Sequence, residues 1–252
     1  MSIVFAFSFG VFGALVASFV GVVSERAYTG QSWHTGRSKC DSCNTMLSAP
    51  DLVPVLSWLL SHGRCRSCGS KVTGAHALVE AGVGTLFAVA YATLGLGLPL
   101  LAFLVALSVL LFVVLYDLRH TIVPLTGSSL LLLASLTFAL LTRADAHAFG
   151  LTLLTAGGVS LFFFLIYAAS RGRAMGLGDA PVAFSLALLV GSAHAVPGLL
   201  FSFWIGALFG IGLLLGRRGG PTMGIEVPFV PFLAAGFLLA YFTQWNPIPL
   251  GL

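Results

Sequence analysis

The sequence predicts an all-α polytopic membrane protein with about eight transmembrane helices and a zinc-ribbon-like loop that carries four cysteines. Three observations support this fold class: 58% of the 252 residues are hydrophobic, only 8% are charged, and the apolar residues gather into eight segments. A soluble domain carries about 25% charged residues, so this chain lacks the polar surface that a soluble protein needs. We therefore expect membrane lipid to cover most of its surface.

Each apolar segment is long enough, or nearly so, to cross a bilayer about 30 Å thick, which takes about 20 helical residues. The first segment has no basic leading region and no small-residue cleavage site, so we expect it to remain as a helix and not to be removed as a signal peptide. The fourth and sixth segments are short. The predicted spans are residues 3–23, 76–94, 98–116, 128–141, 149–169, 180–193, 197–215 and 227–242.

The lysine and arginine residues predict the orientation, because cytoplasmic loops are enriched in them. With eight spans, eleven of the twelve fall on one side, including Arg217 and Arg218, and only Arg143 lies opposite. A wrong number of spans would have scattered these charges, so we expect the long loop after the first span to be cytoplasmic and both termini to lie outside. The basic residues flank apolar segments and form no patch with interleaved aromatics, so no nucleic-acid partner is expected. The oligomeric state stays open.

Two aspartates lie at the predicted cytoplasmic ends of spans. Asp117 follows the third span, and Asp179 precedes the sixth, directly behind Gly176 and Gly178. Desolvating a carboxylate is costly, and the structural alternatives are a solvated loop residue or, for Asp179, a helix N-cap. Two carboxylates at one depth favour an acid/base pair, and the two glycines would let a substrate backbone approach closely.

Four cysteines form two CxxC pairs, separated by twenty-one residues: Cys40 with Cys43, and Cys65 with Cys68. This spacing is typical of a tetrahedral four-thiolate zinc site. Disulfides are the alternative, but a cytoplasmic loop is kept reduced. A zinc ion with four thiolate ligands has no open position, so we expect it to be structural and not catalytic.

Two further features belong to this part of the chain. The apolar segment 51–60 between the cysteine pairs is too short to span, so we expect it to lie on the membrane surface or to pack on the zinc module. Glu80 lies about one turn inside the second predicted span. An intramembrane carboxylate is a functional candidate, and the alternative is an interfacial glutamate paired with a nearby cation. From these features we predict a first transmembrane helix in residues 1–24, a cytoplasmic zinc-binding loop in residues 25–75, and a seven-helix membrane catalytic domain in residues 76–252.

Ordered motifs extend over nearly the whole chain. They are Ala17-Ser18-Phe19-Val20 with Arg26, Ser38-Lys39-Cys40-Asp41-Ser42-Cys43, Pro54-Val55-Leu56-Ser57-Trp58-Leu59, Gly63-Arg64-Cys65-Arg66-Ser67-Cys68, Leu78-Val79-Glu80, Tyr116-Asp117, Ile122-Val123-Pro124, Gly176-Leu177-Gly178-Asp179 and Val227-Pro228-Phe229-Val230-Pro231-Phe232-Leu233-Ala234. In this order they resemble the bacterial type IV prepilin peptidases, the GxGD aspartic membrane proteases of type IV pilus and type II secretion systems. The sequence departs from the family pattern at Gly21, Leu125, Pro181 and Val230, where the family commonly has Asn, an acidic or amide residue, Lys and Gly.

The resemblance implies a leader peptidase of the bacterial cytoplasmic (inner) membrane that cuts prepilin and pseudopilin precursors after the last glycine of a basic leader. Asp117 and Asp179 would form the catalytic dyad, in which two carboxylates share one proton. Gly176, Gly178 and Glu80 would be supporting residues, the two glycines beside the dyad and Glu80, together with Arg26, in the methylation described next. The resemblance also implies N-methylation of the new N-terminus from S-adenosylmethionine, for which no glycine-rich dinucleotide fingerprint is present.

Two alternatives share the aspartates. Proteases of the presenilin and signal-peptide-peptidase type also carry Tyr-Asp and Gly-Leu-Gly-Asp, but their Pro-Ala-Leu motif is replaced here by Pro231-Phe232-Leu233, and the cysteine loop is foreign to them. A transporter would use the aspartates to relay protons or bind cations. Such transporters more often hold carboxylates near the bilayer midplane and contain an inverted repeat, and the sequence has neither feature.

Overall fold

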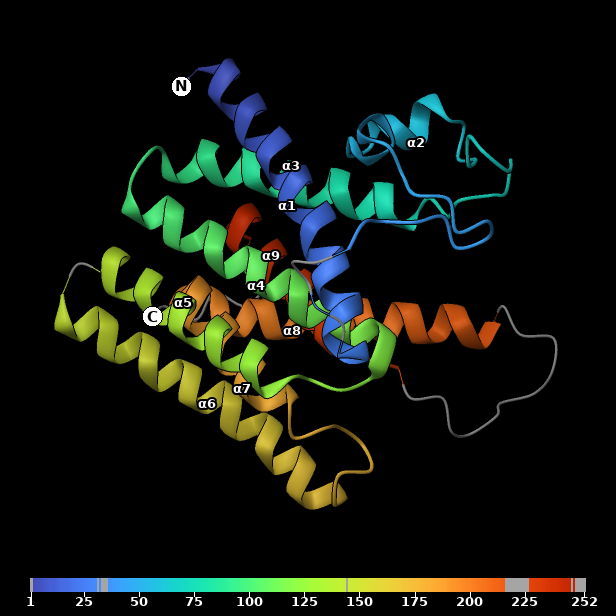
Figure 1. Ribbon diagram of the computed structural model, residues 1–252. Helices are drawn as coiled ribbons and strands as arrows, with labels where there is room; N and C mark the ends of the chain where they lie inside the picture. Colours follow the sequence, from blue (N-terminus) through green and yellow to red (C-terminus); the bar gives the residue numbers. More distant parts are fainter. Residues whose placement is uncertain are drawn as a thin grey trace. The chain divides into compact units, whose positions relative to one another are not determined.

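The computed structural model describes residues 2–30, 32, 36–143, 145–215, 227–245 and 247. Helices and two isolated β-bridges make up the regular structure of these residues (Figure 1). The helices are α1 (Ile3–Thr29), the 3-10 helix η1 (Ala49–Leu52), α2 (Leu56–Leu60), α3 (Ala75–Leu94), α4 (Leu98–His120), α5 (Leu125–Thr142), α6 (Ala146–Ser170), α7 (Asp179–Val190), α8 (Ser192–Leu215) and α9 (Val230–Thr243).

Each of the eight predicted spans coincides with a helix, so the all-α prediction is confirmed. The six helices α1, α3, α4, α5, α6 and α8 are long and apolar enough to cross a membrane, whereas α7 and α9 are shorter, with 12 and 14 residues. The number of spans therefore stays a prediction. Arg217 and Arg218, which helped to predict it, lie outside the described residues.

The chain forms two compact units, Met1–Leu104 and Val105–Leu252, and their boundary lies within α4. In the first unit α1 packs along α3, and glycines allow the two helices to approach closely. A Cβ atom on Gly13 would lie 2.7 Å from the Phe87 ring, and one on Gly84 would lie 2.7 Å from the carbonyl oxygen of Gly10. Close backbone contact of this kind is common between membrane helices, where small residues replace the hydrophobic effect as the basis of packing.

The centre of the second unit is α7, which contacts α5, α6, α8 and α9. Ten of its 12 residues are buried, as expected for a short helix that is apolar on every face. Because protein and not lipid surrounds α7, this helix does not need the full length of a membrane span. Its first residue is Asp179, so the position of this aspartate is fixed by the packing of the most buried helix in the described part of the unit.

Candidate active site and metal centre

Asp117 lies in the last turn of α4, with 4% of its surface exposed. Its Oδ2 atom accepts a hydrogen bond of 3.2 Å from the backbone N–H of Val230. Val230 is the first residue of α9, and the first N–H groups of a helix have no carbonyl partner within that helix. The carboxylate thus supplies this partner and fixes the start of α9 beside the end of α4.

Asp179 begins α7 and is 7% exposed. The N-cap of this helix is Gly178, and no side-chain hydrogen bond caps it, so the N-cap alternative for Asp179 is wrong. The chain enters the helix through a tight turn in which the N–H of Asp179 donates to the carbonyl of Gly176 at 3.3 Å. The carboxylate is therefore held at the helix start without being used as a cap.

The segments that carry the two aspartates meet. Both aspartates are buried, one at the end of α4 and the other at the start of α7. The chain after α4 turns at Thr121, a β-branched residue with a φ of 52° in the left-handed region. This turn brings Val123 against Gly178, where an added Cβ atom would lie 2.7 Å from the Cβ of Val123. Two buried carboxylates 62 positions apart in the sequence thus belong to segments that contact each other.

The two glycines of this motif differ in their surroundings. Gly176 is exposed, and the nearest atom to a Cβ placed on it is Oδ2 of Asp179, at 3.8 Å. Gly176 therefore has the open backbone that the sequence predicted. The space beside Gly178 is instead occupied by Val123, so the missing side chain of Gly178 admits another part of the same chain.

Glu80 lies in α3, in the first unit. Its Oε2 atom accepts a hydrogen bond of 2.7 Å from the backbone N–H of Val55, the residue before α2. Val55 has a φ of 62°, which is a genuine outlier for a β-branched residue. The Glu80 contact is thus to backbone of the cysteine loop, and the supporting role predicted for Glu80 stays a prediction.

The two CxxC pairs have the same local structure. In each pair, the backbone N–H of the first cysteine donates to the carbonyl of the residue five positions later. The carbonyl of the same cysteine accepts from the N–H of the residue four positions later, which has a positive φ. The first knuckle has the bonds Cys40 N to Thr45 O (3.0 Å) and Asn44 N to Cys40 O (2.9 Å), and the second has Cys65 N to Ser70 O and Gly69 N to Cys65 O (both 2.9 Å). The repeated turn aims both pairs of thiols at one point.

The four sulfur atoms lie within 4.8 Å of one another, and Cys40 Sγ is 4.0 Å from Cys68 Sγ. A tetrahedral zinc ion with Zn–S bonds of about 2.3 Å separates its sulfur ligands by about 3.8 Å. All four cysteines are free in the structure. The donor set and its spacing therefore fit a four-thiolate zinc site, as the sequence predicted.

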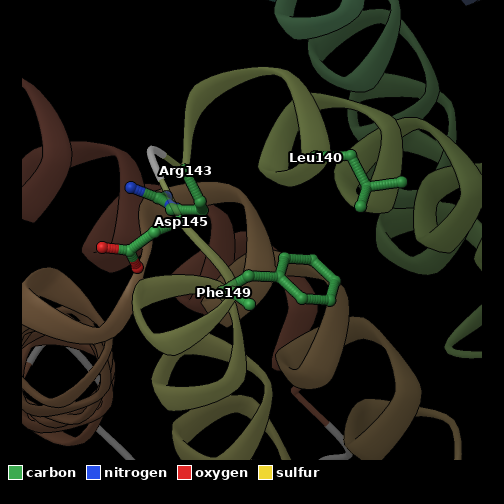
Figure 2. A pocket seen from close by; sticks show the side chains of 5 residues that line it. Leu140, Arg143, Asp145 and Phe149 are labelled. Carbon is green, nitrogen blue, oxygen red and sulfur yellow. The ribbon is translucent and has the colours of Figure 1, made fainter.

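A cavity of about 220 Å³ lies at the turn between α5 and α6, in the second unit. Figure 2 shows Arg143 and Asp145 on one side of it and Leu140 and Phe149 on the other. None of the candidate catalytic residues lines this cavity. The Asp145 carboxylate accepts the N–H of Ala148 at 2.7 Å and so caps α6, which is a structural use of that side chain.

Sequence reasoning missed two functional contacts, the Val230 N–H on Asp117 and the Val123 side chain on Gly178. Both residues belong to motifs that the resemblance singled out, so their positions carried a signal. The sequence contained no signal for the partners of these residues, Asp117 and Gly178. A hydrogen bond from a backbone N–H and a close contact with a side chain form only when the helices pack together.

Known proteins match both halves of the chain. Residues 11–94 match the model of the bacterial peptidase A24 N-terminal domain, and residues 104–211 match the type IV leader peptidase family, so the matches divide close to the boundary between the two units. No solved structure gives a significant match.

Curated relatives extend this match over most of the chain. The prepilin leader peptidase/N-methyltransferase of Bacillus subtilis is 30% identical, over 92% of this chain and 91% of that protein. The proteins of the same name from Myxococcus xanthus and Aeromonas salmonicida are 32% and 33% identical, over 86% and 83% of this chain and 66% and 74% of their own lengths. The chain belongs to the type IV leader peptidase family.

Proposed function

We propose that this protein is an aspartic endopeptidase of the bacterial inner membrane that removes the leader from prepilin and pseudopilin precursors. The observation that supports it most is the burial of Asp117 and Asp179 on segments that contact each other through Val123 and Gly178. The names of the relatives give the reaction class and the substrate. Neither a presenilin-like protease nor a transporter is favoured by these relatives.

In the proposed reaction the two carboxylates share one proton, because two adjacent negative charges repel each other. The ionised carboxylate takes a proton from water as the water oxygen attacks the scissile carbonyl carbon, and the protonated one donates its proton to the carbonyl oxygen. The C–N bond then breaks as the leaving amine takes a proton from the carboxylate that had received it from water. One hydroxyl of the tetrahedral intermediate gives its proton to the other carboxylate, which leaves a carboxylic acid product and restores the shared proton. Which aspartate acts first as the base stays unassigned.

We place the substrate chain along the exposed backbone of Gly176, beside the Asp179 carboxylate. The distribution of basic residues favours the cytoplasmic side for both aspartates and for the cysteine loop. There the basic leader of a precursor would stay in the cytoplasm, while the hydrophobic segment after the cut stays in the membrane.

The direct test measures cleavage of a purified prepilin by Asp117→Asn and Asp179→Asn proteins in lipid. Each substitution keeps the shape of the side chain but removes the ability to exchange a proton, so we expect cleavage to fall by at least 10²-fold. Asp145→Asn is the matched control, because asparagine also caps a helix, and it should cleave normally. A dyad variant that cleaves as well as the control would refute the mechanism.

We assign Cys40, Cys43, Cys65 and Cys68 as ligands of a structural zinc ion. The ion would join the two knuckles and thereby close a loop that is too small and too polar to fold by itself. With four thiolates around it, it would have no position for a substrate.

We further propose that the protein N-methylates the mature substrate, as the names of its relatives state for those proteins. S-adenosylmethionine supplies the methyl group when bound, and we assign it no residues. Mature pilin and cofactor with a labelled methyl group test this activity separately from cleavage. Label should appear on the pilin N-terminus with wild-type protein and with Asp117→Asn, and its absence from both would refute methylation.

A further inference from the structure

The cysteine loop exposes an unusual amount of apolar surface for a segment outside the membrane. Leu56, Leu59 and Leu60 of α2 are 54–70% exposed, and Leu52 and Val53 just before them are exposed as well. Five large apolar side chains are thus exposed within nine residues, and clusters of exposed apolar side chains in native proteins mark contact sites. We call these five residues the leucine face.

The opposite side of α2 is fixed to the protein through Trp58. A Cβ atom on Gly63 or on Gly74 would lie 3.1 Å from the indole ring, and the indole N–H donates to the carbonyl of Val72 at 3.1 Å. Gly74 directly precedes α3. The indole therefore docks one side of α2 beside the start of α3, while the leucine face stays exposed.

The bond between Glu80 and Val55 sets the depth of α2 along α3. Glu80 is the sixth residue of α3, about 8 Å along the helix axis from its start. Helical side chains tilt toward the N-terminus, so a bond from Glu80 holds Val55 within the first two turns. At this level α3 already exposes Leu78, which is 75% accessible. If α3 crosses the membrane from Ala75, α2 lies at the depth of the lipid headgroups.

The conformation of Val55 shows that this position is imposed. A β-branched residue with a φ of 62° costs on the order of 1–3 kcal/mol, and such strain persists only where the surroundings enforce it. The Glu80 bond is the enforcing contact that the structure provides. A loop that served only to hold zinc would not need a strained residue between its knuckles.

The charge of the loop indicates which partner the leucine face contacts. Between residues 36 and 74 the loop carries five basic residues, Arg37, Lys39, Arg64, Arg66 and Lys71, and two acidic ones, Asp41 and Asp51. Basic residues beside an interfacial apolar segment favour anionic lipid headgroups.

We infer that η1 and α2 form an interfacial anchor, whose leucine face inserts into an anionic lipid surface and which Glu80 holds at the depth of the α3 start. The inference does not depend on the proposed peptidase activity. Its partner is the bilayer in which the protein itself is embedded.

Photo-crosslinking tests the anchor. The full-length protein carries p-benzoylphenylalanine in place of Leu60 or, as the matched control, of Ser42, which is also exposed but lies in the first knuckle next to Asp41. Both are reconstituted in phosphatidylglycerol-rich nanodiscs, irradiated and analysed by mass spectrometry. We expect at least fivefold more lipid adduct at position 60 than at position 42, and less at position 60 in purely zwitterionic lipid.

Three results would overturn the inference. Equal yields of lipid adduct at positions 60 and 42 would refute the interfacial anchor. Adducts from position 60 to protein in place of lipid, either to a second copy or to an added prepilin, would refute it as well. Equal yields in the two lipids would remove the role of the basic residues.

The role of Glu80 has its own test in the position-60 protein. Glu80→Ala removes the acceptor for Val55 and should lower the lipid adducts at least threefold, whereas Glu80→Gln keeps an acceptor oxygen and should preserve them. Zinc content serves as the folding control, and one ion per chain is expected in both variants. Unchanged lipid adducts in Glu80→Ala, or equal losses in both variants, would show that the hydrogen bond from Val55 to Glu80 does not hold α2 at this depth. The comparison of lipid adducts at positions 60 and 42 tests the anchor even if neither Glu80 variant folds.

Discussion

Gly178 lies against Val123 so closely that no other residue type fits there without movement. A Cβ atom at Gly178 would be 2.7 Å from the Cβ and 2.9 Å from the Cγ2 of Val123. The backbone itself does not demand glycine, because φ is −64° and ψ is −23°, an ordinary helical conformation. The glycine before Asp179 is therefore required by packing between the two aspartate-bearing segments.

This contact predicts that Gly178→Ala weakens both the fold and the activity. The added methyl group meets two rigid atoms of a β-branched side chain, so we expect a loss of about 1–3 kcal/mol of stability, as is typical of overpacking, and a cleavage rate at least tenfold lower. Thermal unfolding and prepilin cleavage measure the two effects. Val123→Ala should rescue the variant only in small part, because it removes Cγ1 and Cγ2 but keeps the Cβ atom that lies 2.7 Å from the added methyl group.

Gly176→Ala is the matched control for stability. Its Cβ would make only an ordinary contact with Asp179, at 3.8 Å. A Gly178→Ala protein as stable as Gly176→Ala, or no rescue by Val123→Ala, would show that the contact does not constrain the two segments.

Much of the fold could be predicted from the sequence, because burial in lipid leaves a strong and simple signal. All eight apolar segments are helices, and the cysteine spacing predicted a cluster that the structure contains. The differences concern helix ends. The first helix continues to Thr29, past the predicted end at residue 23, because polar residues such as Glu25 and Arg26 can extend a helix beyond the apolar core of the bilayer.

The contacts of the candidate site were less predictable. The aspartates could be named because a carboxylate beside an apolar segment is rare, but nothing in local sequence indicates that Asp117 accepts a hydrogen bond from Val230, 113 positions away. The hydrogen-bond partner of Glu80 could not be predicted from local sequence either. A carboxylate one turn inside a helix has many possible partners, and only the path of the loop determines that a backbone N–H is the partner it contacts.

Removing zinc should unfold the cysteine loop without releasing the protein from the membrane. A structural zinc ion contributes on the order of 10 kcal/mol to the folding of small modules. We expect Cys65→Ser, or a strong chelator, to make Arg64, Arg66 and Lys71 sensitive to trypsin. Ser42→Ala keeps all four sulfurs and is the control. A metal-free loop that resists trypsin as well as this control would contradict the structural role.

The acidity of Cys40 predicts how zinc binding depends on pH. Hydrogen bonds from the backbone N–H groups of Cys43 and Ser42 lower the pKa of the Cys40 thiol to about 6. A lowered pKa means that the thiolate is already present above pH 6 and is lost as the pH falls through that value. At pH 7 zinc should therefore displace fewer than four protons, and at pH 5 the number should rise toward four.

Calorimetry of zinc binding in buffers of different ionisation enthalpy counts these protons. The affinity should accordingly fall more steeply per pH unit below pH 6 than above it. Release of four protons at pH 7 would show that Cys40 has an ordinary thiol pKa.

Gly191 predicts a second stability effect, far along α7 from the candidate active site. This residue ends the helix with a φ of 86°, and a Cβ atom on it would lie 2.5 Å from Nη2 of Arg143. Gly191→Ala thus forces alanine into a left-handed backbone conformation, and we expect it to lower the stability by about 1–2 kcal/mol. The guanidinium at the end of the flexible Arg143 side chain can move aside, so Arg143→Ala in the same chain should regain only a small part of the loss.

Gly150→Ala is the control, because an added Cβ there has no neighbour within 4 Å. It should unfold at the wild-type temperature or slightly above it, because alanine favours the helix by up to about 1 kcal/mol. If Gly191→Ala unfolds at the same temperature as this control, the end of α7 can shift to accommodate a side chain.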